Sequence, residues 1–217
     1  MLPFRAYLPP LPKLLALTAA VLIPFTLVSV IAARIWAHEG FAFEAPLMLW
    51  VHTHIGVWFL PIATVLHYLG KTALAVPLIA LAAVWLHLRK KTGYAVFVIV
   101  STALPTAVML LAKLIFDRPR PLLWPRMIAE SNTSFPSGHS TFAAAVVTML
   151  FLIYRHSPHR RAIFICGTLF VLLMGFSRIY LGVHYPTDVL VGWINGVATV
   201  SAVYYCFFHR YLHKQNK

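Results

Sequence analysis

The stretch Ser134–Phe142, SFPSGHSTF, places a histidine directly after a Pro-Ser-Gly turn, between two long apolar runs. A turn of this kind can aim consecutive backbone amides at one ligand, an arrangement suited to an anion. The imidazole beside the turn can give or take a proton near neutral pH. The sequence therefore predicts an anion site with a proton donor attached, built from Ser137, Gly138 and His139.

A second polar stretch, SRIYLGVHYPTDV, holds Arg178, His184 and Asp188 in one short segment. Asp188 is four residues after His184, so its carboxylate can accept the imidazole N–H and leave the other ring nitrogen free as a base or nucleophile. Pro186 suits the first turn of a helix that begins here. Taken alone, His184 fits a structural role as well as a catalytic one.

The third stretch, KLIFDRPRP, contains Lys113, Arg118 and Arg120. Lys113 and Arg120 are seven residues apart, which brings them close to one face of a helix. A single lysine of this kind is usually a headgroup anchor at the end of a membrane span. Several cations beside backbone amides, however, bind phosphate oxygens and stabilise the charge of a phosphoryl-transfer transition state.

The elements that must position these residues are membrane helices. Of the 217 residues, 60% are hydrophobic and 11% are charged, and the mean hydropathy is +0.79. This composition excludes an ordinary soluble domain and predicts an all-α, polytopic bundle in one domain, residues 1–217. The stretch Gly56–Leu69 has the aromatic and apolar mix of an interfacial helix. The six expected spans are Leu14–Ala33, Thr72–Leu88, Tyr94–Phe116, Thr141–Tyr154, Ala162–Phe176 and Thr187–Phe208.

Charged residues are distributed unevenly between the two ends of these spans. Basic residues precede the first span and follow the second, fourth and sixth, whereas all five acids fall on the other side. Because Lys and Arg favour cytoplasmic loops, we expect a plasma (inner) membrane protein with both termini in the cytoplasm and the polar stretches on the outer face. The net charge of +13 then reflects orientation and anionic lipid rather than nucleic acid. The basic residues of the expected cytoplasmic side are Arg5, Lys13, Arg89, Lys90, Lys91, Arg155, Arg160, Arg161, Arg210, Lys214 and Lys217.

The three polar stretches match a known signature in order and in spacing. K-x6-R-P lies at Lys113–Pro121, P-S-G-H at Pro136–His139, and S-R-x5-H-x3-D at Ser177–Asp188. The chain thus resembles the type 2 phosphatidic acid phosphatase (PAP2) superfamily. Within DRPRP, the spacing from Lys113 selects Arg120 and leaves the role of Arg118 open.

The resemblance implies a mechanism and a set of site residues. His184 is expected to attack phosphorus and form a phosphohistidine, Asp188 to orient it, and His139 to protonate the leaving group and then activate water. The residues expected to bind the phosphate are Lys113, Arg120, Ser137, Gly138 and Arg178. No cofactor or metal is expected. The substrate is a membrane lipid phosphate, open among undecaprenyl pyrophosphate, phosphatidylglycerophosphate, phosphatidic acid and a lipid A phosphate.

Several alternatives accompany this reading. A relative could transfer the phosphoryl group to another lipid, and a transporter or binding protein for anionic lipids would use a similar polar cluster without chemistry. His52 and His54 favour packing over a zinc site, since no third ligand is near. Cys166 and Cys206 are expected as small buried residues.

The access of the substrate is a further expectation. The phosphate is expected to enter at headgroup depth while the lipid tails stay in the bilayer. Two readings of Gly56–Leu69 are open: Trp58, Phe59 and Tyr68 contact the tails, or the stretch is a packed connector without substrate contact. The sequence does not predict an oligomeric state.

Overall fold

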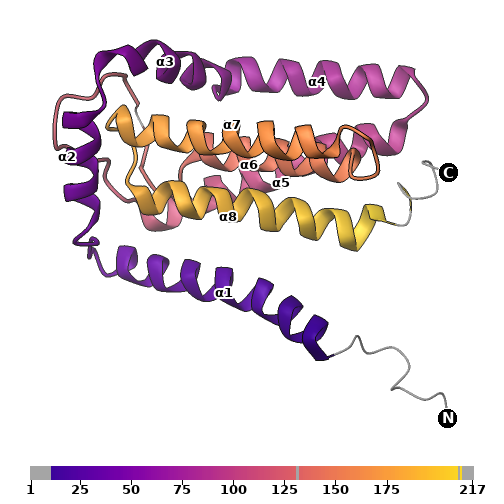
Figure 1. The fold of residues 1–217 in the computed structure, drawn as a ribbon, viewed down its shortest axis with the longest axis horizontal. Helices are drawn as coiled ribbons and strands as arrows, with labels where there is room; N and C mark the ends of the chain where they lie inside the picture. Colours follow the sequence, from indigo (N-terminus) through magenta and orange to yellow (C-terminus); the bar gives the residue numbers. More distant parts are fainter. Residues whose placement is uncertain (1–10, 131, 210, 212–217) are drawn as a thin grey trace. The chain divides into compact units, whose positions relative to one another are not determined.

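The computed structural model describes residues 11–130, 132–209 and 211, and every regular element in this part of the chain is helical (Figure 1). These residues form two compact units, one that ends at Glu39 and one that begins at Gly40. The first unit holds α1, Leu11–Trp36, an apolar helix that covers the expected first span. The expectation of a single domain stays a prediction. Of the basic residues named above, Arg5, Arg210, Lys214 and Lys217 lie outside the described residues.

The second unit is the helical bundle that carries the polar stretches. Its elements are α2 (Glu44–His54), a short 3-10 turn (Val57–Phe59), α3 (Leu60–Leu69), α4 (Thr72–Leu88), α5 (Thr92–Phe116), α6 (Gly138–Ile153), α7 (Arg160–Tyr180) and α8 (Pro186–Val203), which continues as a π-helical segment, Tyr204–Phe208. The five spans predicted in this unit each correspond to one helix, α4 to α8. α4 has the predicted bounds, and the ends of the other four differ from the prediction by at most a few residues.

The number of membrane spans is four or five by length and composition. The part Thr18–Trp36 of α1, α5, α7 and α8 with its extension are each long and apolar enough to cross a bilayer. A bent pair, α2 with the Val57–Leu69 segment, adds a fifth candidate. The helices α4 and α6 have 17 and 16 residues, fewer than the roughly 20 that an untilted crossing needs. The predicted count of six is therefore not confirmed.

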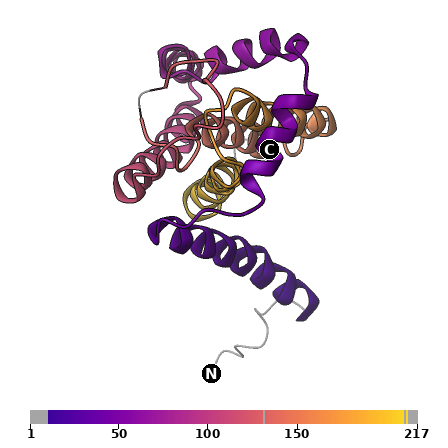
Figure 2. The same ribbon diagram turned by 90° about the vertical axis from the view of Figure 1, so that its left-hand side faces the viewer.

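One helix was not predicted. The sequence suggested a single interfacial helix at Gly56–Leu69, but α2 precedes it, and the two helical segments are bent by 93°. Figures 1 and 2 show α2 running across the end of the bundle where α7 ends and α8 begins. Its pattern was missed because the helix is short and mixes apolar residues with Glu44, His52 and His54.

The crossing of α6 and α8 depends on two glycines. A Cβ at Gly192 would lie 2.7 Å from the Ser137 carbonyl oxygen, and one at Gly196 would lie 2.6 Å from the Thr141 carbonyl oxygen. The main chains therefore approach more closely than any side chain would allow, as in other small-xxx-small pairs of membrane helices. This contact places the first turn of α6 against the first turn of α8, and the Ser137 N–H donates to the Asp188 carbonyl at 3.0 Å.

The end of the bundle away from these first turns is apolar inside and basic outside. Buried aromatic and aliphatic side chains fill its interior, among them Tyr94, Phe97, Met149 and Tyr204. The α4–α5 turn, the α6–α7 loop and the end of α8 all lie at this end (Figure 1). The polar stretches with the expected site residues lie at the other end, so the sequence-based separation of charge holds within this unit.

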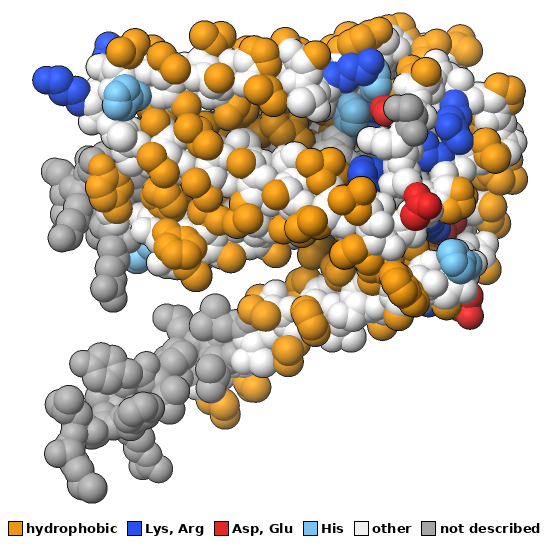
Figure 3. All heavy atoms as spheres, turned by 180° about the vertical axis from the view of Figure 1, so that it is seen from behind, with side chains coloured by type: hydrophobic (Ala, Val, Ile, Leu, Met, Phe, Trp, Pro, Cys, Tyr) orange, Lys and Arg blue, Asp and Glu red, His pale blue; other side chains and the backbone are white. Residues whose placement is uncertain are grey.

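The outer surface is apolar between the two ends. Figure 3 shows hydrophobic side chains over the middle of the molecule, with charged side chains gathered toward the ends. Exposed leucine, valine and phenylalanine side chains along α4, α5 and α7 account for much of this surface. A surface of this kind suits contact with lipid. Cys166 and Cys206 belong to it, since both are exposed; the expectation that they are buried was wrong.

Candidate active site

His184 lies at the centre of the site, on the short loop between α7 and α8, with 2% of its surface exposed. Its Nδ1 is 3.5 Å from Asp188 Oδ2 and 3.4 Å from Ser134 Oγ. Its Nε2 is 3.2 Å from NH1 of Arg120. These partners assign the proton to Nδ1, facing the carboxylate, and leave the Nε2 lone pair directed at Arg120.

Burial lowers the pKa of His184 to about 3, although the hydrogen bond to Asp188 acts to raise it. The positive charges of Arg120 and Lys113 lower the pKa further, while the charge of Asp188 opposes them. His184 is therefore a neutral imidazole near pH 7. A neutral ring with a free lone pair is the form that a nucleophile requires.

Asp188 is held on both carboxylate oxygens. Oδ2 accepts a hydrogen bond from Ser134 Oγ and another from the Tyr185 N–H at 2.9 Å. Oδ1 accepts one from NH1 of Arg118 at 2.6 Å. The side chain is fully buried. The carboxylate that faces His184 thus has a fixed orientation.

Arg118 is the link between Asp188 and helix α2. Its NH2 donates to Glu44 Oε2 at 2.7 Å, and its guanidinium lies 3.9 Å from the centre of the Tyr185 ring. Burial lowers the pKa of Arg118, but the carboxylates of Asp188 and Glu44 more than offset this and raise it overall. Thr187 Oγ1 closes the network, since it accepts from Arg118 at 2.9 Å and donates to Glu44 Oε1 at 2.5 Å. Arg118 therefore positions Asp188, which explains its presence next to Arg120.

Arg120 faces His184 instead. Its Nε donates to the Asn132 carbonyl at 2.7 Å, its NH1 to the Val183 carbonyl at 2.7 Å, and its NH2 to the side chain of Asn132. Burial lowers the pKa of Arg120, partly offset by Glu130. Lys113, at the end of α5, donates from Nζ to the Thr133 carbonyl. The spacing rule that selected Arg120 over Arg118 thus agrees with the geometry.

The Pro-Ser-Gly-His turn begins α6. Ser137 is the N-cap, and its Oγ accepts from the Ser140 N–H at 3.4 Å and from Ser140 Oγ at 2.9 Å. Because Ser137 is fully buried in this cap, it does not line the cavity described below, whereas Gly138 and His139 do. A phosphate-binding role for Ser137 stays a prediction.

His139 stacks on His67 of α3, with ring centres 5.2 Å apart. Its Nε2 lies 2.9 Å from the His67 carbonyl oxygen, and NH1 of Arg178 lies 3.0 Å from His67 Nδ1. Arg178 also donates to Ser177 Oγ at 3.2 Å and to the Ala63 carbonyl at 3.4 Å. The structure thus places Arg178 behind the two stacked rings rather than on the cavity wall.

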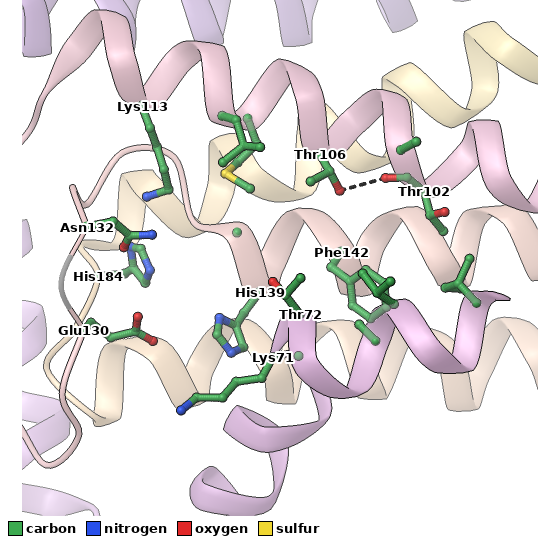
Figure 4. A pocket seen from close by; sticks show the side chains of 18 of the residues that line it. Lys71, Thr72, Thr102, Thr106, Lys113, Glu130, Asn132, His139, Phe142 and His184 are labelled. Atoms are coloured by element: carbon green, nitrogen blue, oxygen red, sulfur yellow. Dashed lines mark hydrogen bonds between the residues drawn. The ribbon is translucent and has the colours of Figure 1, made fainter. Parts of the chain in front are cut away.

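A cavity of about 600 Å³ joins the site to the space between α4 and α5. Figure 4 shows its polar end, where Lys113, Asn132, Glu130, His139 and His184 converge. Away from this end the lining comes mostly from apolar residues of the two helices, and the hydroxyls of three threonines, Thr72, Thr102 and Thr106, also line the cavity. The apolar residues include Val76, Ile79, Ala103, Met109 and Leu110.

The expected lipid contacts at Gly56–Leu69 are not part of this lining. Phe59 is 4% exposed and packs edge-on against Phe176 and Tyr180. Trp58 and Tyr68 are exposed but lie outside the cavity. The expected contact of Phe59 with lipid was wrong, because Phe59 belongs to the core that fixes α3 to α7. The contacts expected for Trp58 and Tyr68 stay predictions.

A metal site is not favoured by the surroundings of the histidines. Ligand atoms of His67, Glu130 and His139 lie within 4.8 Å of one another, a spacing that would suit a cation. However, Arg178 already donates to His67 Nδ1, and a second positive charge there would be repelled. His52 and His54 stack on Trp124 and Trp50, with ring centres 4.2 and 4.9 Å apart, which agrees with the packing role expected for them.

Sequence reasoning missed five residues of the site. One signal was available for Glu44 and Glu130, since only five acids occur in the chain and acids are rare in apolar segments without a function. No comparable signal marked His67, Asn132 or Ser134.

Comparison with known proteins supports the same assignment. The PAP2 superfamily profile matches residues 94–212, which contain all three motifs. The chain belongs to the PAP2 superfamily. It is 31% identical over 145 residues to phosphatidylglycerophosphatase B of Bacillus subtilis, covering 64% of this chain and 71% of that protein. It is 36% identical over 81 residues to an undecaprenyl-diphosphatase of Sulfolobus acidocaldarius, covering 37% of this chain and 35% of that protein.

Solved PAP2 structures share the fold. The crystal structure of a transmembrane PAP2 type phosphatidylglycerolphosphate phosphatase from Bacillus subtilis superposes with a TM-score of 0.72 at 24% identity, covering 89% of this chain and 97% of that one. The structure of Aquifex aeolicus LpxE superposes with a TM-score of 0.58 at 26% identity, covering 75% and 95%. The PAP2 family and the enzyme class expected from the motifs, a phosphatase of membrane lipids, are thereby confirmed.

Proposed function

We propose that this protein removes phosphate from a membrane lipid through a phosphohistidine formed on His184. The observation that carries the proposal is the orientation of that ring, with Nδ1 toward Asp188 and Nε2 toward Arg120. Binding of an anion alone would not require a carboxylate behind the imidazole. The pair is suited to nucleophilic attack because the carboxylate stabilises the charge that the ring acquires as its nitrogen bonds to phosphorus.

In the first step, the phosphate enters the polar end of the cavity and its oxygens are bound by Lys113, Arg120 and the Gly138 amide. Arg120 then donates to a phosphate oxygen instead of to Nε2 of His184, which frees the lone pair. Nε2 attacks phosphorus while the bond to the leaving oxygen breaks. His139, which the negative charge of the bound phosphate favours as the imidazolium, gives its Nδ1 proton to that oxygen and keeps its Nε2–H on the His67 carbonyl.

In the second step, water takes the place of the leaving alcohol. His139 Nδ1 accepts a proton from the water, whose oxygen attacks phosphorus, and the N–P bond breaks to restore His184. The phosphate departs with four oxygens, one of them from water. In this scheme, Arg178 acts on His139 through His67.

The lipid chain follows the apolar part of the cavity between α4 and α5. In this arrangement the phosphate lies at headgroup depth while the tail points along the helices into the bilayer. We further propose six spans, with α4 and α6 as tilted or locally short crossings, both termini in the cytoplasm, and the site on the outer face of the plasma membrane. The basic loops at the end of the bundle opposite the site support this orientation.

Phosphate release from purified protein tests the function. The protein in detergent with EDTA should release phosphate from short-chain phosphatidic acid, phosphatidylglycerophosphate or farnesyl diphosphate, and quenching with ³²P-labelled substrate should trap an acid-labile label on His184. Absence of the label from active enzyme would contradict the covalent mechanism. Addition of excess glycerol distinguishes transfer from hydrolysis, because a transferase would form glycerol phosphate.

A further inference from the structure

Glu130 is an acid in a site otherwise built to bind an anion. It lies on the loop between α5 and α6, lines the polar end of the cavity, and its side chain is 18% exposed. Lys113 and Arg120 line the same end of the cavity. A carboxylate there weakens the attraction for phosphate, so its presence calls for a function.

The contacts of Glu130 leave most of its hydrogen-bonding capacity unused. Oε2 is 3.7 Å from NH2 of Arg120, and Oε1 is 3.7 Å from Nδ1 of His67. Both distances are too long for a hydrogen bond. Among the described residues, the carboxylate has these two ion-pair contacts and no hydrogen bond within 3.5 Å. It therefore retains acceptor sites for a donor on a ligand.

The position of Glu130 relative to the two histidines identifies that ligand group. Ligand atoms of Glu130, His67 and His139 lie within 4.8 Å of one another. In the proposed function, in-line attack puts His184 on the side of phosphorus opposite the leaving oxygen. Figure 4 shows Glu130 beside His139 at the polar end of the cavity. Since His139 is the acid for the leaving oxygen in the proposed function, the atoms next to that oxygen would bind within reach of Glu130. These atoms belong to the leaving group and not to the transferred phosphate.

We propose that Glu130 is a specificity residue that selects phosphomonoesters whose leaving alcohol carries a neighbouring hydroxyl, and disfavours diphosphates. A hydroxyl on the adjacent carbon, as in a glycerol headgroup, donates to the carboxylate. The leaving group of a diphosphate is itself a phosphate, so its oxygens meet a like charge at the same place. The inference rests on the proposed function and concerns which lipid phosphates are efficient substrates.

Three probes of similar chain length test the proposal in wild-type protein. They are 1-oleoyl glycerol 3-phosphate, which has the neighbouring hydroxyl, its 2-deoxy analogue, and geranylgeranyl diphosphate. We expect kcat/KM to be roughly tenfold higher for the hydroxyl-bearing probe than for the deoxy analogue, since a hydrogen bond to a charged group is lost. Equal values for these two probes would overturn the proposal whether or not any variant folds. If none of the three releases phosphate, the proposed function itself fails.

Two substitutions separate the hydrogen bond from the charge. Glu130→Gln keeps an acceptor but removes the charge, so the ratio of kcat/KM for the diphosphate over the hydroxyl-bearing monoester should rise about tenfold. Glu130→Ala removes both, so the preference over the deoxy analogue should disappear as well. The matched control is Asp117→Asn, which makes the same charge change at an exposed position outside the cavity. An unchanged ratio in Glu130→Gln, or an equal rise in the control, would overturn the proposal.

Discussion

The two sides of His184 differ in how completely their polar groups are paired. Behind Nδ1, the network of Asp188, Arg118, Glu44 and Ser134 is almost fully buried, and its hydrogen bonds are short. Toward the leaving group, Glu130 has contacts of 3.7 Å only and His139 is partly exposed. The first arrangement fixes the orientation of His184, the proposed nucleophile, before substrate binds, which is how enzymes reduce the cost of reorganisation. The second leaves room for the substrate to supply the missing partners.

The largest effect should come from removing the reacting group on each side. His184→Ala abolishes the covalent intermediate, so kcat should fall by at least about 10⁴-fold. His139→Ala removes proton transfer, and kcat should fall by roughly 10²- to 10⁴-fold for a monoester but less for a diphosphate, whose leaving group needs less protonation. Steady-state kinetics on both substrate types would check this. Ordinary turnover by His184→Ala, or an equal loss on both substrates for His139→Ala, would contradict the assigned roles.

In the buried network behind Nδ1 of His184, substitution of Arg118, which contacts two carboxylates, should lower the stability more than substitution of Glu44. Arg118→Met leaves the buried carboxylates of Glu44 and Asp188 facing each other, which should cost about 3–5 kcal/mol of stability. Glu44→Gln keeps Arg118 on Asp188 and loses one charged hydrogen bond, so about 1–3 kcal/mol is expected. Thermal unfolding in detergent, with kcat measured below the transition, gives both values.

A larger loss of stability in Glu44→Gln than in Arg118→Met would show that Arg118 does not hold Asp188 in place. Arg34→Met serves as a control, because Arg34 and its partner Glu39 are half-exposed and such surface pairs contribute little.

The apolar part of the cavity should affect activity on long-chain lipid phosphates more than activity on short soluble analogues. Ala103 of α5 lines the cavity, and Ala103→Phe would fill part of the space proposed for the lipid tail. We expect kcat/KM for a long-chain lipid phosphate to fall roughly tenfold, with little change for a short soluble analogue. Leu111→Phe is the control, since Leu111 is 59% exposed and lies outside the lining. Equal losses on long and short substrates would place the tail elsewhere.

The smallest effect should be that of moderate acidity on the nucleophile. Because the pKa of His184 is lowered to about 3, below the ordinary value near 6.5, the ring stays neutral as the pH falls from 7 to 5. It gains a proton, and loses its lone pair, only near pH 3. Once the ionisation of the substrate near pH 6 is accounted for, kcat/KM should show no decline from His184 over that range. A protonation of His184 near pH 6.5, followed by ¹⁵N NMR of labelled histidine, would contradict this.

The motif residues could be predicted because they are close in sequence. The separation of four residues between His184 and Asp188 already implied their contact. The spacing from Lys113 selects Arg120, and this arginine lines the cavity and contacts His184. The partners of Arg118 could not be predicted in this way, since Glu44 is 74 residues away and only the three-dimensional packing brings α2 to the start of α8. His67 reaches His139 across 72 residues, and periodicity gives no sign of such pairs.

The helices were predicted more reliably than their roles. Long apolar runs gave α4 to α8 nearly in full, because hydrophobic length is a property of each segment alone. The cavity between α4 and α5 is a property of two helices and of the side chains that fail to fill the space between them. The aromatic residues near Phe59 were therefore assigned to the lipid, although Phe59 packs in the core.

The close crossing of α6 and α8 makes the spacing of the two histidines proposed to be catalytic a property of the main chain. His139 begins one helix and His184 precedes the other, and Gly192 and Gly196 hold the backbones together. The lipid-facing side chains of the same helices therefore do not determine the distance between the two histidines. Substitutions at these lipid-facing positions can match a membrane of different thickness or composition without changing the spacing of His139 and His184.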